Sequence, residues 1–113
     1  MIETIDNVSI VVDNLNSAVK WYSEILGLKH KFTEESIQWA ELDAGGRSSL
    51  ALKTSGKPQV CLVVADMDKE MERLSVLGVK FSEVFDLPEG MGRVTSFDDP
   101  WGNEIGFYEA PRK

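Results

Sequence analysis

The chain of 113 residues has one cysteine, one histidine and no long apolar run. Because Cys61 stands alone, no disulfide forms within the chain, which favours a reducing compartment such as the cytoplasm. No stretch approaches the roughly 20 apolar residues of a membrane span. The first residues also lack the basic start of a signal peptide. We therefore expect a cytoplasmic protein with no membrane partner.

Basic residues are scarce as well. The chain has 12 Lys and Arg against 19 Asp and Glu, for a net charge of −7, which argues against nucleic acid as a partner. The sequence contains no glycine-rich phosphate loop, no CxxC pair and no nucleophile elbow. No second histidine is present to activate Cys61. The length is that of one domain with a real core.

The sequence repeats itself. The segment VSIVVDNLN at 8–16 returns as VCLVVADMD at 60–68, and LGLK at 26–29 returns as LGVK at 77–80. Two matches in the same order and at nearly one offset indicate an internal duplication. The modules extend over about residues 1–54 and 58–113, joined by the linker TSGKP.

The pattern of each module predicts a strand, a helix and three further strands. The first helix is expected over 15–26 because its apolar residues recur at helical spacing, with Asn14 or Asn16 as the cap and Gly27 as the stop. The second helix is expected over 67–77. The expected strands are 5–12, 29–33, 37–42 and 48–53, then 59–64, 79–85, 93–97 and 104–108.

A βαβββ module has one sheet face covered by its helix and one face uncovered, so alone it is marginally stable. Two modules that pack with their uncovered faces toward each other bury those faces and so stabilise each other. The sequence therefore predicts a single α+β domain: tandem βαβββ modules that form a curved, incompletely closed eight-stranded sheet around a cavity, with the helices outside.

Four segments resemble the vicinal oxygen chelate superfamily, which includes glyoxalase I, extradiol dioxygenases and the fosfomycin- and bleomycin-resistance proteins. They are IDNVSIVVDNLNSAVKWYSEILGL, ELDAGGRSSLAL, VCLVVADMDKEMERLSVLGVKF and DDPWGNEIGFYE, and together they cover essentially the whole chain. The resemblance implies a homodimer. In the family's enzymes it also implies a divalent metal held by His and Glu from four strands facing the cavity.

The four positions that match those ligands are Asn7, Ala51, Gln59 and Gly106. A neutral amide is a poor ligand for zinc or iron, and alanine and glycine offer no ligand atom. We therefore expect no metal, no cofactor and no catalytic residues. Gly106 weakens a strand in its interior, and we interpret it as leaving open the space where an enzyme of this family holds a carboxylate.

Strand alternation gives candidates for the lining of the cavity. Asn7 and Gln59 occupy equivalent positions of the two repeats; their amides either orient a ligand or hydrogen-bond to each other or to water. Trp39 and Glu41 share a strand face. The full set of predicted ligand-binding residues is Asn7, Ser9, Trp39, Glu41, Ala51, Gln59, Cys61, Met91, Arg93, Glu104, Gly106 and Tyr108.

The leading functional hypothesis is a metal-independent small-molecule binding protein of this superfamily that sequesters an aromatic or cationic compound, as bleomycin-resistance proteins do. One alternative is a metal-dependent lyase, isomerase or dioxygenase with atypical ligands. Another is an accessory dimerisation module whose cavity is vestigial. Metal content separates the second hypothesis from the other two, and ligand-induced stabilisation separates the first from the third.

Overall fold

Residues 2–111 are described by a computed structural model, in which the chain divides into two units. The N-terminal unit is residues 7–59, and the C-terminal unit is residues 60–111 together with residues 2–6. Strand β1 (Ile2–Val11) therefore contributes to both. The two predicted modules begin at residue 1 and end at residue 113. Residues 1, 112 and 113 lie outside the described residues.

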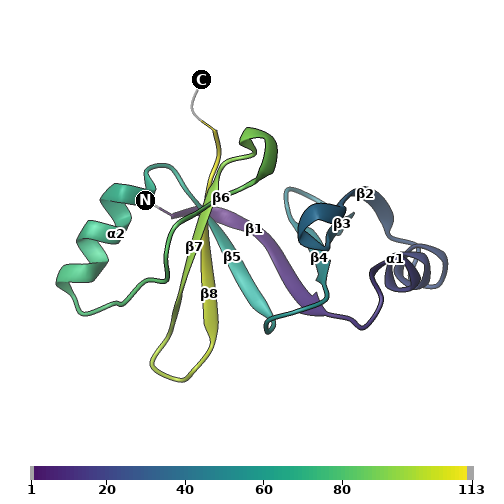
Figure 1. The fold of residues 1–113 in the computed structure, drawn as a ribbon, viewed down its shortest axis with the longest axis horizontal. Helices are drawn as coiled ribbons and strands as arrows, with labels where there is room; N and C mark the ends of the chain where they lie inside the picture. Colours follow the sequence, from purple (N-terminus) through teal and green to yellow (C-terminus); the bar gives the residue numbers. More distant parts are fainter. Residues whose placement is uncertain (1, 112–113) are drawn as a thin grey trace. The chain divides into compact units, whose positions relative to one another are not determined.

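The N-terminal unit contains the helix and three strands that follow β1 along the chain. They are α1 (Leu15–Glu24), β2 (Lys29–Glu34), β3 (Trp39–Asp43) and β4 (Ser49–Lys53). The hydrogen-bonded order of the strands is β2–β3–β4–β1. Strands β1 and β4 are parallel, whereas β3 is antiparallel to both of its neighbours. Helix α1 lies on one side of these strands (Figure 1).

Helix α1 begins as the sequence predicts. The side chain of Asn14 caps it by accepting a hydrogen bond of 2.9 Å from the Ser17 N–H. The helix ends two residues early, at Glu24, and the chain then turns at Gly27, whose φ of +78° suits glycine. The apolar stripe of α1 packs on one sheet face, forming a core of Leu15, Ala40, Leu42 and Leu52 with Ile10, Val12, Ala18, Val19, Tyr22 and Leu28.

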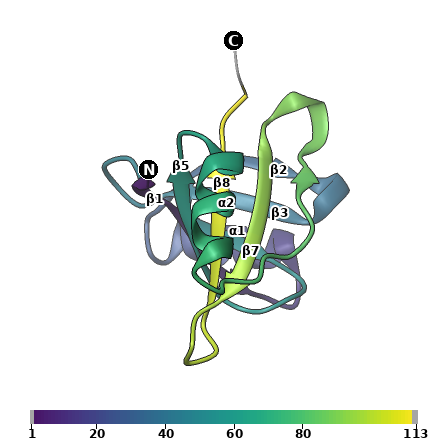
Figure 2. The ribbon, with the colours of Figure 1, turned by 90° about the vertical axis from the view of Figure 1, so that its left-hand side faces the viewer.

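The C-terminal unit contains α2 (Met67–Val76), β6 (Phe85–Asp86), β7 (Arg93–Asp98), β8 (Glu104–Glu109) and all of β5 (Gln59–Val64) except its first residue. Its strands are ordered β1–β5–β8–β7–β6. Helix α2 runs in front of β8, with β5 and β7 to either side (Figure 2). Its core joins Val64, Met67 and Phe107, and the rings of Phe81, Phe97 and Phe107 contact one another at centroid distances of 5.2–5.8 Å.

The α+β class and the order of helices and strands are confirmed, and β5 has the predicted bounds. The strand expected over 79–85 is wrong, since only Phe85–Asp86 is strand. Phe81 and Val84 both pack into the core although they are three residues apart, which is incompatible with the two-residue period of a strand. Likewise β3 starts at Trp39 rather than Ile37, because Glu35–Ile37 forms a 3-10 turn that ends at Gln38 with φ of +50°.

Within residues 2–111, no helix has the length and apolar character needed to cross a membrane.

Candidate functional site

The N-terminal unit presents a polar face on the side of its sheet opposite α1. Strand register puts Ser9, Ala51 and Glu41 in one row across β1, β4 and β3. Residues directly opposite in a ladder share a face, and so do residues two apart along a strand. The polar face therefore brings together six residues: Asn7, Ser9, Trp39, Glu41, Ser49 and Ala51.

Burial divides this polar face into two parts. Ser9 and Ala51 are fully buried, and Asn7 and Ser49 are each 4% exposed. Gln59 lies near this part, where its backbone oxygen is 3.5 Å from the Ser9 hydroxyl. Trp39 and Glu41, on β3, are only partly buried and remain accessible to solvent. The accessible part of the polar face is therefore the part on β3 and its neighbour β2.

Trp39 and Glu41 are linked to each other. The indole Nε1 of Trp39 donates a hydrogen bond of 2.8 Å to Glu41 Oε2. This bond fixes the orientation of the ring and leaves the second carboxylate oxygen of Glu41 available. An aromatic ring beside a carboxylate is an arrangement that attracts cationic groups.

Two residues of β2, which the sequence analysis missed, complete the accessible part. The register between β2 and β3 shifts between His30 and Phe32, and Phe32 lies directly opposite Glu41. Lys31 reaches the same face, where its Nζ donates to Ser49 Oγ at 2.9 Å. A bulge of this kind redirects a side chain. Simple alternation along KHKF would place Lys31 and Phe32 on opposite faces, so the sequence carried no clear signal for this pair.

In the C-terminal unit, Glu104, Gly106 and Tyr108 share the face of β8 that lies opposite α2. The alternation of β8 requires this, because Phe107 is fully buried in the core beneath α2. Cys61 similarly lies on the face of β5 opposite Leu62 and Val64, which pack in that core. The Tyr108 hydroxyl donates to the backbone oxygen of Met91 at 2.8 Å.

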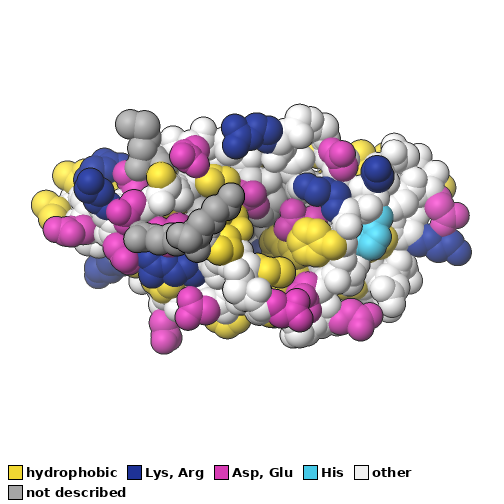
Figure 3. Space-filling view, turned by 90° about the horizontal axis from the view of Figure 1, so that it is seen from above, with side chains coloured by type: hydrophobic (Ala, Val, Ile, Leu, Met, Phe, Trp, Pro, Cys, Tyr) yellow, Lys and Arg dark blue, Asp and Glu magenta, His cyan; other side chains and the backbone are white. Residues whose placement is uncertain are grey.

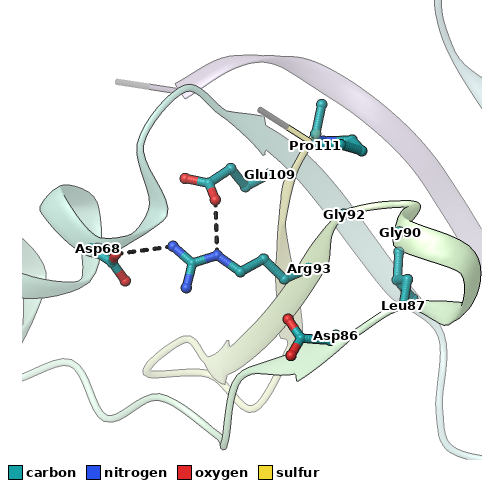
Figure 4. A pocket seen from close by; sticks show the side chains of 9 residues that line it. Asp68, Asp86, Leu87, Gly90, Gly92, Arg93, Glu109 and Pro111 are labelled. Carbon is teal, nitrogen blue, oxygen red and sulfur yellow. Dashed lines mark hydrogen bonds and ion pairs between the residues drawn. The ribbon is translucent and has the colours of Figure 1, made fainter. Parts of the chain in front are cut away.

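Arg93, one of the predicted ligand-binding residues, does not share that face. It lies directly opposite Glu109 in the β7–β8 ladder. Glu109 follows Tyr108 and therefore points to the opposite side of the sheet, toward α2, so Arg93 also faces α2. Its Nε donates to Glu109 Oε1 at 2.8 Å, and its Nη2 lies 3.0 Å from Asp68 Oδ2 at the start of α2 (Figure 4).

Arg93 lines a pocket of about 550 Å³ in the C-terminal unit. Figure 4 shows its guanidinium between Asp68 and Glu109, with Asp86 on the other side of its stem. The pocket is lined by Asp68, Asp86, Leu87, Gly90, Gly92, Arg93, Glu109, Ala110 and Pro111. Glu109 and then Asp68 raise the pKa of Arg93 above its ordinary value by hydrogen bonding to its charged form.

Glu109 also binds the first turn of α2. Its Oε2 accepts a hydrogen bond of 2.7 Å from the Met67 N–H, where a carboxylate is favoured by the helix dipole. The Arg93 guanidinium is thus already engaged by two carboxylates. We conclude that this network fastens α2 to β7 and β8.

The side chains described do not fit the metal centre of the family's enzymes. No group of three or more His, Cys, Asp or Glu residues within residues 2–111 is arranged to hold a metal ion. Of the four matching positions, Ala51 and Gly106 bring no donor atom, and Asn7 and Gln59 bring neutral amides. The expectation of a metal-free protein stays a prediction.

A model of the Glyoxalase/Bleomycin resistance protein/Dioxygenase superfamily matches residues 4–107, and the chain belongs to this superfamily. No curated protein sequence matches the chain.

Solved structures of the same fold include two methylmalonyl-CoA epimerases. The chain is similar to that of Mycobacterium tuberculosis with a TM-score of 0.81 and 22% identity, over 99% of this chain and 90% of that one. It is similar to a Streptomyces coelicolor epimerase variant in complex with 2-nitronate-propionyl-CoA with a TM-score of 0.80 and 20% identity, over 97% and 96%. A hypothetical protein from Bacillus halodurans C-125 gives 0.78 and 18%, over 96% and 95%. Likeness at such identities shows the fold alone.

Proposed function

We propose that the chain is a metal-independent small-molecule binding protein of this superfamily, which holds an aromatic or cationic guest on the polar face of its N-terminal unit. The observation that carries the proposal is the Trp39–Glu41 pair, in which an indole and a carboxylate joined at 2.8 Å lie on an accessible sheet face. The effect on the cell would come from sequestration, as in bleomycin-resistance proteins, without chemistry on the guest.

The composition of the polar face supports binding rather than metal chemistry. Ala51 lies directly opposite Glu41 on β4 and is fully buried, so it brings neither a donor atom nor an exposed surface to the guest. Polar groups among apolar and aromatic walls are typical of sites that orient small ligands. A metal centre on the usual pattern of this family would instead need donor atoms at Ala51 and Gly106, which these residues lack.

A thermal-shift screen of small aromatic and cationic compounds, run in a chelator, tests the proposal. We expect guests that raise the unfolding temperature without added metal, because binding to the folded state alone stabilises it. Glu41→Gln and Trp39→Leu should each weaken such a guest by about tenfold or more, roughly 1.4 kcal/mol.

Trp101 provides the matched control. It is 83% exposed in the turn between β7 and β8, in the other unit. Trp101→Leu should therefore leave the affinity unchanged. Guests that bind only with added metal, or that bind equally well to the Trp39 and Glu41 variants, would contradict the proposal and favour the enzyme and the accessory-module alternatives, respectively.

A further inference from the structure

Two opposite charges on the polar face are each held by a neutral partner. Lys31 Nζ donates to the Ser49 hydroxyl at 2.9 Å, and Glu41 Oε2 accepts from the Trp39 indole at 2.8 Å. In the described part of the chain, neither Lys31 nor Glu41 forms an ion pair. An ammonium has three donor hydrogens and a carboxylate has about four acceptor sites, so both groups keep unused capacity.

Lys31 and Glu41 are held beside neighbouring positions of β4. Ser49, which binds Lys31, and Ala51, which lies opposite Glu41, are two residues apart on β4. That step is about 7 Å along a strand. A small ligand that carries an ammonium and a carboxylate can offer one charge-assisted hydrogen bond to each of the two residues.

Aromatic rings flank the carboxylate. Phe32 lies opposite Glu41 on β2 and is 37% exposed, and Trp39 precedes Glu41 by two residues on the same face. Such rings attract a bound ammonium group through their negative faces and provide apolar area for the body of a ligand.

The register places four other charged residues on this face: Lys29, Glu34, Asp43 and Lys53. Asp43 lies opposite Ser49, and its carboxylate accepts a hydrogen bond of 2.8 Å from the Gly45 N–H in the following turn. Lys53 lies opposite Trp39 and has an interaction of its own. Lys31 and Glu41 are the pair of opposite charges that hydrogen-bond to other members of the polar face, Ser49 and Trp39. Figure 3 shows Lys and Arg side chains interspersed with Asp and Glu side chains over the surface seen from above.

We propose that the guest is a small zwitterion with an aromatic or apolar body, of the α-amino-acid type. Its ammonium binds Glu41 between Phe32 and Trp39, and its carboxylate binds Lys31. The inference rests on the function proposed above and specifies the class of guest for the same face.

Three probes with the same phenyl body test the charge requirement: L-phenylalanine, phenethylamine and 3-phenylpropionate. Calorimetric titration of the full chain should give the highest affinity for L-phenylalanine. The probes that keep only one charge should bind about tenfold more weakly or worse, because each loses one charge-assisted contact.

Variants assign each charge to its residue. Glu41→Gln should weaken phenylalanine and phenethylamine but spare phenylpropionate. Lys31→Met should weaken phenylalanine and phenylpropionate but spare phenethylamine. Lys80→Met, an exposed lysine of the C-terminal unit, is the control and should change no affinity. Circular dichroism confirms that each variant is folded.

The outcomes separate the two proposals. If phenethylamine binds as tightly as phenylalanine and Lys31→Met has no effect, the zwitterion is overturned while the binding function stands. If none of the three probes binds, the zwitterion is likewise overturned, and the function is decided by the thermal-shift screen. If a probe binds but ignores Glu41→Gln, Lys31→Met and Trp39→Leu alike, the guest lies elsewhere and both proposals fail.

Discussion

Arg93 and Glu109 lie opposite each other on β7 and β8, and their 2.8 Å ion pair also connects both strands to helix α2. The connection exists because Glu109 uses both oxygens, Oε1 for Arg93 and Oε2 for the Met67 N–H. The Glu109 side chain is 6% exposed, whereas Asp68, the other partner of Arg93, is 72% exposed.

Removing Glu109 should therefore cost far more stability than removing Asp68. Glu109→Ala leaves the buried Met67 N–H without its acceptor and the partly buried Arg93 guanidinium with Asp68 alone, and we expect a loss of about 2–3 kcal/mol in the free energy of unfolding. Asp68→Ala removes an exposed ion pair and should cost under about 1 kcal/mol. Urea unfolding measures both. Equal losses would show that Glu109 does not fasten α2.

Gly92 should tolerate no side chain. Its φ is +111°, and a Cβ there would meet the backbone oxygen of Glu109 and lie 2.9 Å from Tyr108 Cε1. Gly92→Ala should therefore destabilise the chain by about 2–4 kcal/mol, from backbone strain and overpacking together. Gly90 also has a positive φ, of +68°, but open space around it. Gly90→Ala is the control and should cost about 1 kcal/mol. A smaller loss for Gly92→Ala than for Gly90→Ala, measured by the same unfolding assay, would argue against this packing.

Asp99 makes the turn between β7 and β8 sensitive to acid. Its carboxylate accepts hydrogen bonds from the side chain and backbone of Asn103 and from the Trp101 N–H, at 2.8–2.9 Å. These bonds, that of the Asn103 side chain foremost, hold the pKa of Asp99 below its ordinary value. A lowered folded-state pKa contributes stability that is present above the unfolded-state pKa and is lost as the pH falls through the folded-state pKa.

Asp99→Ala should therefore lower the unfolding temperature at neutral pH, and its difference from the wild type should shrink below about pH 4. Thermal unfolding followed by circular dichroism over this pH range measures the difference. Glu83→Ala, at an exposed position, is the control and should show little difference at any pH. A difference for Asp99→Ala that stays constant with pH would mean that its charge is not involved.

Local sequence signals were sufficient for the regular elements. Asn14 and the apolar spacing after it locate α1, and a valine-rich run locates β5. They were not sufficient where tertiary packing determines the conformation of the backbone. Phe81 and Val84 are drawn into the core beneath α2, and this removes most of the strand expected there.

The sequence likewise predicted one part of the candidate site and missed another. Alternation alone places Asn7, Ser9 and Ala51 on one face, as their register shows. The bulge that brings Lys31 and Phe32 onto this face is not predicted by the alternation of residues along β2, because it depends on the pairing of β2 with β3. The homodimer, the absence of metal and the remaining binding residues stay predictions.

Native mass spectrometry of the chain isolated from its own cells tests the central claim most directly. The account predicts the 12.6 kDa chain carrying an organic adduct that persists after chelation and is absent from the Trp39→Leu variant. A stoichiometric metal adduct whose removal by the chelator also releases the organic adduct would contradict it.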